Sequence, residues 1–127
     1  MCFKLLLKSQ MKSKIGVLLL QLGTPDDPSV SSVRKYLKQF LNDPRVIDIP
    51  YLLRKILVNL IIVPFRAPKS AKIYKELWDH GNGVSPLIYH SEELRSELQK
   101  RFSNENVHIR LAMRYKNPSM PSVLNQM

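Results

Sequence analysis

An arginine and a tyrosine near the end of the chain have the chemistry to bind an anion. They follow the apolar run Val107–Met113, which alternates in the manner of a strand with one buried face. A guanidinium such as that of Arg114 can bind a carboxylate through two parallel hydrogen bonds, with Tyr115 beside it. A second apolar run ends similarly, in Gln21-Leu22-Gly23-Thr24-Pro25. Because open α/β sheets bind ligands beyond the carboxyl ends of their strands, both strand ends are expected to line one crevice.

The rest of the sequence lacks a recognisable catalytic constellation. The glycine-rich stretch 79–87 has neither the lysine and hydroxyl of a P-loop nor the spacing of a dinucleotide fingerprint. The histidines at 80, 90 and 108 lack metal-ligand spacing, and no nucleophile–base pair is evident. We therefore expect a binding crevice lined by cations and apolar groups, with no metal site and no tightly bound cofactor.

The net charge of +10 leaves nucleic acid, an anionic membrane surface or an acidic ligand as partners. The sequence has no basic run with interleaved aromatics, no zinc-finger spacing and no helix-turn-helix signature, which argues against nucleic acid. The single cysteine, Cys2, excludes an internal disulfide framework. We expect a cytoplasmic protein, with peripheral membrane contact as a further option.

Two strands joined by a long helix-rich crossover predict an α/β layer structure with a parallel sheet. The first strand, 15–21, is continuously apolar and is expected to be buried on both faces. Asp26-Asp27-Pro28 is predicted to begin a helix and Asn42-Asp43-Pro44 to end it. Residues 64–68 predict a loop from which Pro68 opens another helix, and Ser91 is predicted to cap a fourth.

Residues 51–63 predict a helix that is apolar nearly all round, broken by Arg54, Lys55 and Asn59. The run is too short and too interrupted to span a membrane. A helix of this kind is either packed in a core or in contact with something apolar. Both readings remain open: core packing, or a lip that meets a lipid surface or an apolar ligand.

The two ends of the sequence suggest an incomplete domain. Residues 1–13 are expected to be a disordered N-terminal extension, with Met11 as a plausible start. Residues 118–127 resemble the first turns of a helix without a stop signal. We expect residues 14–127 to be one truncated α/β domain; the alternative is a small complete domain.

Several motifs, taken together and in order, resemble those of the ferrochelatase family. They are Gln21-Leu22-Gly23-Thr24-Pro25, Val33–Leu37 with Phe40–Val46, Arg66–Ala71 with Tyr74, Gly83–Leu87, and Ala112–Pro118. No single motif is decisive, but their order and spacing are specific, and the match runs from about residue 14 to the last residue.

The resemblance implies two Rossmann-like domains that face each other across a porphyrin cleft, of which this chain is most of the first. It implies an enzyme that inserts ferrous iron into protoporphyrin IX to make protohaem, with porphyrin and Fe²⁺ as substrates; some bacterial relatives use coproporphyrin. The family's metal-inserting histidine and partner glutamate lie in its second half. No catalytic residue or metal ligand is therefore expected here, and the chain alone is expected to be inactive.

The resemblance also implies which residues surround the porphyrin. They are Leu22, Arg66, Lys69, Tyr74, Ser85, Arg114 and Tyr115. Leu22 lies under the macrocycle, Arg66, Lys69 and Ser85 lie near its rim or order the loop, and Arg114 and Tyr115 form the floor. Residues 51–65 correspond to a lip that contacts the membrane in some members. The alternatives are a non-enzymatic porphyrin- or haem-binding module and a peripheral membrane-binding module.

Overall fold

The computed structural model describes residues 14–103 and 106–127, so the N-terminal extension expected for residues 1–13 lies outside the described residues. The elements follow one another as β1 (Ile15–Gly23), α1 (Val30–Leu41), α2 (Tyr51–Ile56), the π-helix η1 (Leu57–Ile62), α3 (Val63–His80), α4 (Pro86–Arg101), β2 (Val107–Tyr115) and α5 (Met120–Leu124).

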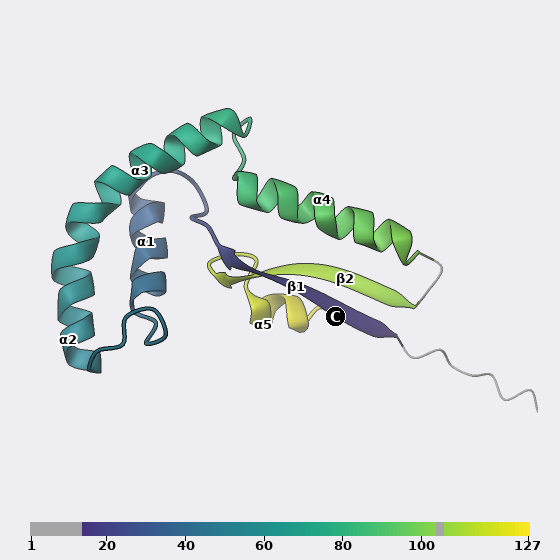
Figure 1. The fold of residues 1–127 in the computed structure, drawn as a ribbon, viewed down its shortest axis with the longest axis horizontal. Coiled ribbons are helices and arrows are strands. Elements are labelled where there is room, and N and C mark those ends of the chain that lie inside the picture. Colours follow the sequence, from purple (N-terminus) through teal and green to yellow (C-terminus); the bar gives the residue numbers. More distant parts are fainter. Residues whose placement is uncertain (1–13, 104–105) are drawn as a thin grey trace, which may run out of the picture.

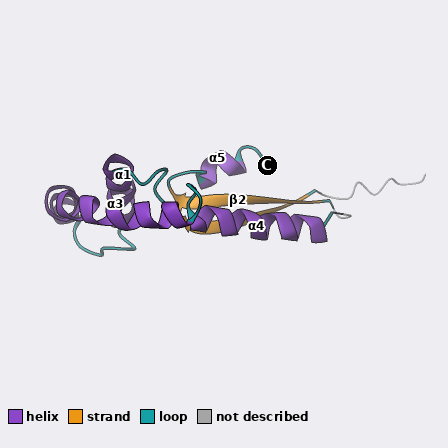
Figure 2. Cartoon of the chain, turned by 90° about the horizontal axis from the view of Figure 1, so that it is seen from above, coloured by secondary structure: helices purple, strands orange, loops and turns teal. Residues whose placement is uncertain are grey.

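The two strands pair in parallel, in a register that runs from Ile15 beside Val107 to Gly23 beside Tyr115. Their carboxyl ends therefore lie next to each other. Helix α4 runs along one side of the strand pair and α5 lies on the other, while α1, α2 and α3 gather beyond the carboxyl ends (Figures 1 and 2). This arrangement confirms the predicted α/β class with a parallel sheet.

The burial of the two strands differs. In β2 the side chains of Val107, Ile109, Leu111 and Met113 are buried while His108 and Arg110 are exposed, as the alternation predicts, but Ala112 is buried as well. In β1 the prediction of burial on both faces is wrong, because Leu20 and Leu22 are about half exposed. The reason is that α4 and α5 pack mainly on β2, so that β1 forms the less covered edge of the described sheet.

Helix α1 begins two residues later than predicted, at Val30 instead of Pro28. Ser29, not Asp26 or Asp27, is the N-cap, and its Oγ accepts a hydrogen bond from the Ser32 backbone N–H at 3.2 Å. Asp27 supports this cap from outside the helix by accepting from the Ser29 N–H at 2.8 Å and the Ser32 hydroxyl at 2.6 Å. The helix ends at Leu41 with Asn42 as the C-cap, as predicted.

Residues 51–80 form one continuous helical run, so the predicted loop at 64–68 is wrong. Proline interrupts an α-helix because it lacks an N–H and crowds the carbonyl four residues earlier. Here the π turn of η1 precedes Pro64, and the Val63 N–H bonds to the Val58 carbonyl, five residues back. The wider turn lets the helix bend and continue through Pro64, and Pro68 also lies inside α3. Figure 1 shows the resulting arc.

Helix α4 begins at Pro86, with Ser85 as the N-cap, so the prediction that Ser91 caps it is wrong. Proline at the first helical position costs no hydrogen bond, which makes Pro86 the better start signal. Ser91 is buried within the helix. The predicted C-terminal helical turns are confirmed as α5, which Ser119 caps through the Ser122 N–H.

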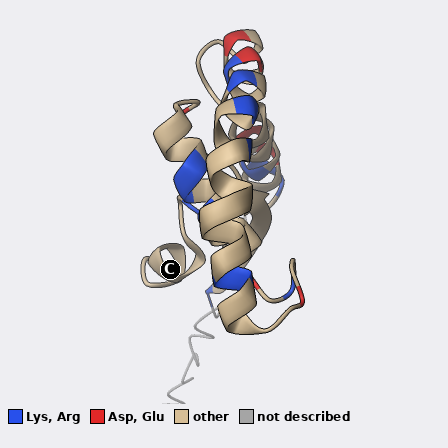
Figure 3. Ribbon diagram, turned by 90° about the vertical axis from the view of Figure 1, so that its left-hand side faces the viewer, with Lys and Arg blue, Asp and Glu red and all other residues tan. Residues whose placement is uncertain are grey.

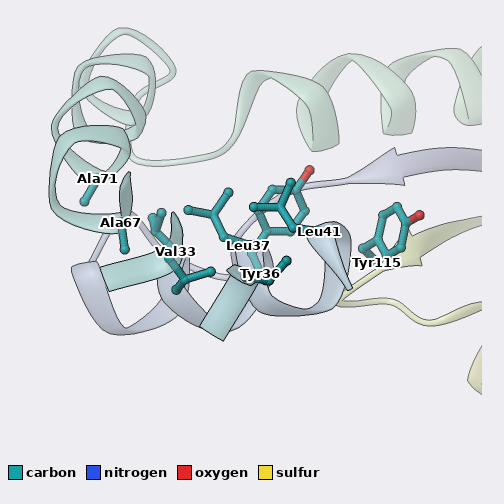
Figure 4. Packing of buried hydrophobic residues seen from close by; sticks show 9 residues of the cluster. Val33, Tyr36, Leu37, Leu41, Ala67, Ala71 and Tyr115 are labelled. Atoms are coloured by element: carbon teal, nitrogen blue, oxygen red, sulfur yellow. The ribbon is translucent and has the colours of Figure 1, made fainter. Parts of the chain in front are cut away.

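The main core lies between α1 and the long helical run, beyond the strand ends. Its members are Val33, Tyr36, Leu37, Leu41, Val58, Val63, Ala67, Ala71 and Tyr115 (Figure 4). The small side chains of Ala67 and Ala71 let α3 approach α1 closely. Tyr115 at the end of β2 belongs to the same cluster, which ties the sheet to this helical layer.

Candidate ligand-binding site

The structure brings the two predicted strand ends together. Because Gln21 pairs with Met113 and Gly23 with Tyr115, the intervening residues Leu22 and Arg114 lie beside each other on neighbouring strands. Both are exposed. The apolar side chain and the guanidinium therefore share the carboxyl edge of the sheet, where α/β folds bind their ligands.

An open hollow of about 890 Å³ lies at this edge. Its lining comes from β1, the end of α1 and the loop after it, α2, the end of β2 and the start of α5. It consists of Leu20, Gln39, Asn42, Asp43, Pro44, Arg45, Lys55, Arg114, Tyr115, Ser119, Met120 and Pro121. The charged members are three cations and one carboxylate, beside apolar side chains.

The carboxylate of Asp43 joins Arg114 and Tyr115 into one network. Its Oδ2 accepts from Arg114 Nη2 at 2.9 Å and from the Tyr115 hydroxyl at 2.9 Å, while Arg114 Nε donates to that hydroxyl at 3.1 Å. Oδ1 accepts from the Arg45 backbone N–H at 2.9 Å. The Arg45 N–H, followed by Arg114 and Tyr115, lowers the pKa of Asp43 to about 2. The guanidinium predicted to bind an external anion thus already has an internal partner.

The sequence analysis does not identify Asp43 as a site residue, because the segment Asn42-Asp43-Pro44 is interpreted only as the end of a helix. The signal that could have found it was its place in the ferrochelatase-like segment Phe40–Val46. Nothing in the sequence reveals its partner, since Asp43 and Arg114 are 71 positions apart.

Tyr74 packs half-buried against the core rather than at the hollow. A row of rings leads from Tyr115 to Phe40 (centroids 5.3 Å apart), on to Tyr36 (5.9 Å) and then to Tyr74 (6.2 Å). Burial raises the pKa of Tyr36 to about 12, and it also raises the pKa of Tyr74. Tyr74 is therefore connected to the site through packed rings and does not line it.

Ser85 joins two loops. Its hydroxyl donates to Thr24 Oγ1 at 3.3 Å, and both residues are buried. Thr24 belongs to the turn after β1 and Ser85 to the start of α4, 61 positions away. Of the two roles that the resemblance implies for Ser85, its surroundings fit the ordering of the loop.

Arg66 and Lys69 are exposed on α3 and do not line the hollow. Figure 3 shows Lys and Arg spread along the helices rather than gathered in one block. The seven predicted residues thus occupy three places: Leu22, Arg114 and Tyr115 at the strand ends, Ser85 in the adjoining loop, and the remaining three on α3.

Two searches of the described residues bear on metal and membrane binding. Residues 14–103 and 106–127 contain no group of three or more histidine, cysteine or acidic side chains arranged to hold a metal ion. Within the same residues, no helix combines the length and the apolar character that crossing a membrane requires.

Parallel strands with flanking helices, and an open hollow at the carboxyl ends of those strands, define a Rossmann-like α/β domain. A family model described as Ferrochelatase matches residues 14–127. The chain therefore belongs to the ferrochelatase family, whose members are lyases of haem biosynthesis.

Curated relatives named as ferrochelatases match most of the chain. One from Coxiella burnetii (strain Dugway 5J108-111) is 48% identical over 115 residues, which are 91% of this chain and 32% of the relative. Others from Actinobacillus pleuropneumoniae serotype 5b (strain L20) and Legionella pneumophila (strain Corby) are each 46% identical, over 91% and 88% of this chain and 36% and 33% of their own lengths. The chain spans about a third of the curated relatives it matches. No solved structure gives a significant match.

Proposed function

We propose that this chain forms the first part of the porphyrin cleft of a ferrochelatase, the enzyme that inserts Fe²⁺ into protoporphyrin IX to make protohaem. One observation carries the proposal. Two family-like segments far apart in the sequence, Gln21–Pro25 and Ala112–Pro118, meet at the carboxyl edge of the sheet, where Arg114 and Tyr115 of the second segment line a hollow of about 890 Å³.

The chemistry of this edge suits a flat, apolar dianion. Leu20 and Met120 line the hollow and offer apolar contact with a macrocycle. Leu22 does not line it but is exposed at the same strand end, and it has no atom that can ligate a metal. Arg45 and Lys55 supply positive charge for carboxylates. Ligand pockets commonly combine apolar walls with a few directed polar groups, as this one does.

Metal insertion also needs a group that accepts the pyrrole protons. The only carboxylate among the described residues that line the hollow is Asp43. It already accepts three hydrogen bonds, and its pKa of about 2 makes it a poor proton acceptor at neutral pH. The family resemblance assigns the proton-accepting histidine and its glutamate to the second half of the enzyme. We therefore propose that this chain binds porphyrin but does not insert iron by itself.

The test uses the purified full chain under anaerobic conditions. The Soret band of protoporphyrin IX is expected to shift on binding, while added Fe²⁺ gives no haem above the uncatalysed rate. Turnover by the chain alone would contradict the proposed inactivity, and absence of porphyrin binding would contradict the proposed cleft.

A chimera distinguishes the proposed enzymatic function from that of a non-enzymatic binding module. Residues 14–127 replace the matching third of the Coxiella burnetii relative. Iron insertion by this chimera is the expected result. A folded chimera that binds porphyrin but inserts no iron would favour the binding module.

A matched pair of variants locates the porphyrin. Leu22 and Leu94 are each 51% exposed, but only Leu22 lies at the strand ends. We expect Leu22→Asp to weaken porphyrin binding by roughly tenfold or more, because it replaces an apolar contact with a carboxylate that must lose hydration when the macrocycle covers it. Leu94→Asp on α4 is expected to leave binding unchanged. If both substitutions weaken binding equally, the porphyrin does not bind at this edge.

We further propose that the segment 51–65 contacts an anionic membrane surface. Of the large apolar residues in this segment, Val58 and Val63 are buried in the core and Ile62 packs partly buried against it. Most of the others are exposed, including Leu60 at 69% and Phe65 at 75%. Because Arg66 and Lys69 follow directly on the same helical run, apolar and positive groups adjoin each other, as in helices that lie at membrane interfaces.

A further inference from the structure

The hydrogen bonds of Asp43 determine how the polar part of the hollow is arranged. Both carboxylate oxygens accept hydrogen bonds, Oδ1 from the Arg45 backbone N–H and Oδ2 from Arg114 and Tyr115. The Asp43 side chain is 14% exposed and that of Arg114 is 38% exposed. The acid is thus the more enclosed partner, and the guanidinium faces the opening.

The three side chains close a ring of hydrogen bonds. The Tyr115 hydroxyl donates to Asp43 Oδ2 and accepts from Arg114 Nε, so its hydrogen and one of its lone pairs both take part in hydrogen bonds. Arg114 donates through Nε and Nη2, and no group among residues 14–103 and 106–127 accepts from its Nη1, whose hydrogens are left for a ligand. The Tyr115 ring cannot follow a moving guanidinium, because it is buried and packs edge-on against Phe40.

The ring also redistributes charge in the hollow. Asp43 offsets the charge of Arg114 at 2.9 Å. Arg45 and Lys55 form no ion pair with any residue in the described part of the chain, so they carry the uncompensated positive charge. Arg114 therefore acts as a directed hydrogen-bond donor, while attraction of an anion falls to the other two cations.

From this geometry we propose that Asp43 is a positioning residue of the site. It holds Arg114 and Tyr115 in a single arrangement at the edge of the hollow, and it acts on the ligand only through them. The ligand part of this inference rests on the proposed porphyrin site, whereas the positioning part concerns the protein without ligand.

Nuclear magnetic resonance of the ligand-free chain tests the positioning directly. The Arg114 Nε–H resonance is expected to exchange slowly with solvent, because that hydrogen is bonded to Tyr115. Asp43→Asn nearly preserves the shape of the side chain but removes its charge, and it is expected to speed this exchange by about tenfold or more. The control is Asp48→Asn, an exposed acid of the same loop. Unchanged exchange in folded Asp43→Asn would overturn the proposal.

A double-mutant cycle then tests whether Asp43 acts through Arg114. We expect Asp43→Asn and Arg114→Gln each to weaken protoporphyrin binding by about tenfold, since charged hydrogen bonds contribute on that order. The double variant is expected to bind no more weakly than Arg114→Gln alone. Additive losses, or tighter binding by Asp43→Asn, would contradict the inference. If the unaltered chain binds no porphyrin, the proposed function fails, and the exchange measurement still decides the positioning role.

Discussion

Gly23 of β1 lies against the backbone of Tyr115 of β2, so closely that a Cβ at Gly23 would collide with the Tyr115 carbonyl oxygen. The two residues are register partners, and Gly23 has a φ of 116°. The strands therefore need glycine here for both space and backbone conformation. This close approach holds Leu22 beside Arg114 at the edge of the hollow.

Replacement of Gly23 is expected to be more costly than replacement of the other positive-φ glycine. Gly83 has a φ of 82° with open space around its missing Cβ, so Gly83→Ala costs only conformational strain, about 1 kcal/mol. Gly23→Ala adds a collision with backbone and is expected to cost at least about twice as much. Urea denaturation of both variants measures the difference, and equal losses would show that the strand ends are free to move apart.

The core between α1 and α3 is expected to provide much of the stability. Leu37 is buried among its partners, and Leu37→Ala should lower the free energy of unfolding by about 2–5 kcal/mol. Leu52→Ala, at an exposed position of α2, should change it by less than about 0.5 kcal/mol. Chemical denaturation of the pair checks this packing, and similar small losses would contradict it.

Acidification should reveal the Asp43 network. The folded state lowers the pKa of Asp43 from 3.8 to about 2, so its contribution to stability is complete above about pH 4 and is lost as the pH falls towards 2. Asp43→Asn is expected to remove this part of the pH dependence, whereas Asp48→Asn should retain it. Unfolding free energies measured from pH 5 to pH 2 by about half-unit steps provide the test. Parallel curves for Asp43→Asn and the unaltered chain would argue against the network.

Vesicle binding should depend on the exposed apolar residues of the long helical run. Leu60→Asp and Phe65→Asp are each expected to weaken binding to phosphatidylglycerol-containing vesicles by roughly tenfold or more, since each removes a large apolar contact. Leu94→Asp on α4 is the control. Co-sedimentation measures the effect, and binding that is insensitive to the first two variants would exclude residues 51–65 as the contact.

Local sequence signals predicted the strands better than the caps and the helix boundaries. Apolar and polar residues alternate along most of β2, with Ala112 as the exception, and the run of aliphatic residues in β1 has no competing helical period. The start of α1 was misplaced because Asp27, Pro28 and Ser29 all favour helix starts, and only the hydrogen bonds of the folded chain identify Ser29 as the cap. The sequence predicts two helices separated by a loop at 64–68, because proline usually ends a helix. The π turn before Pro64, which keeps the run continuous, cannot be recognised from composition.

The sequence by itself determined the α/β class, the two parallel strands and the membership of the ferrochelatase family, because each depends on residue patterns that are local or ordered along the chain. Only the tertiary structure decided that Asp43 is the partner of Arg114, since the two become neighbours through the packing of α1 against the strand ends. It also decided that Tyr74 packs against the core while Leu60 and Phe65 face outward. Which apolar side chain is covered depends on the neighbouring helix, and a single stretch of sequence does not contain that neighbour.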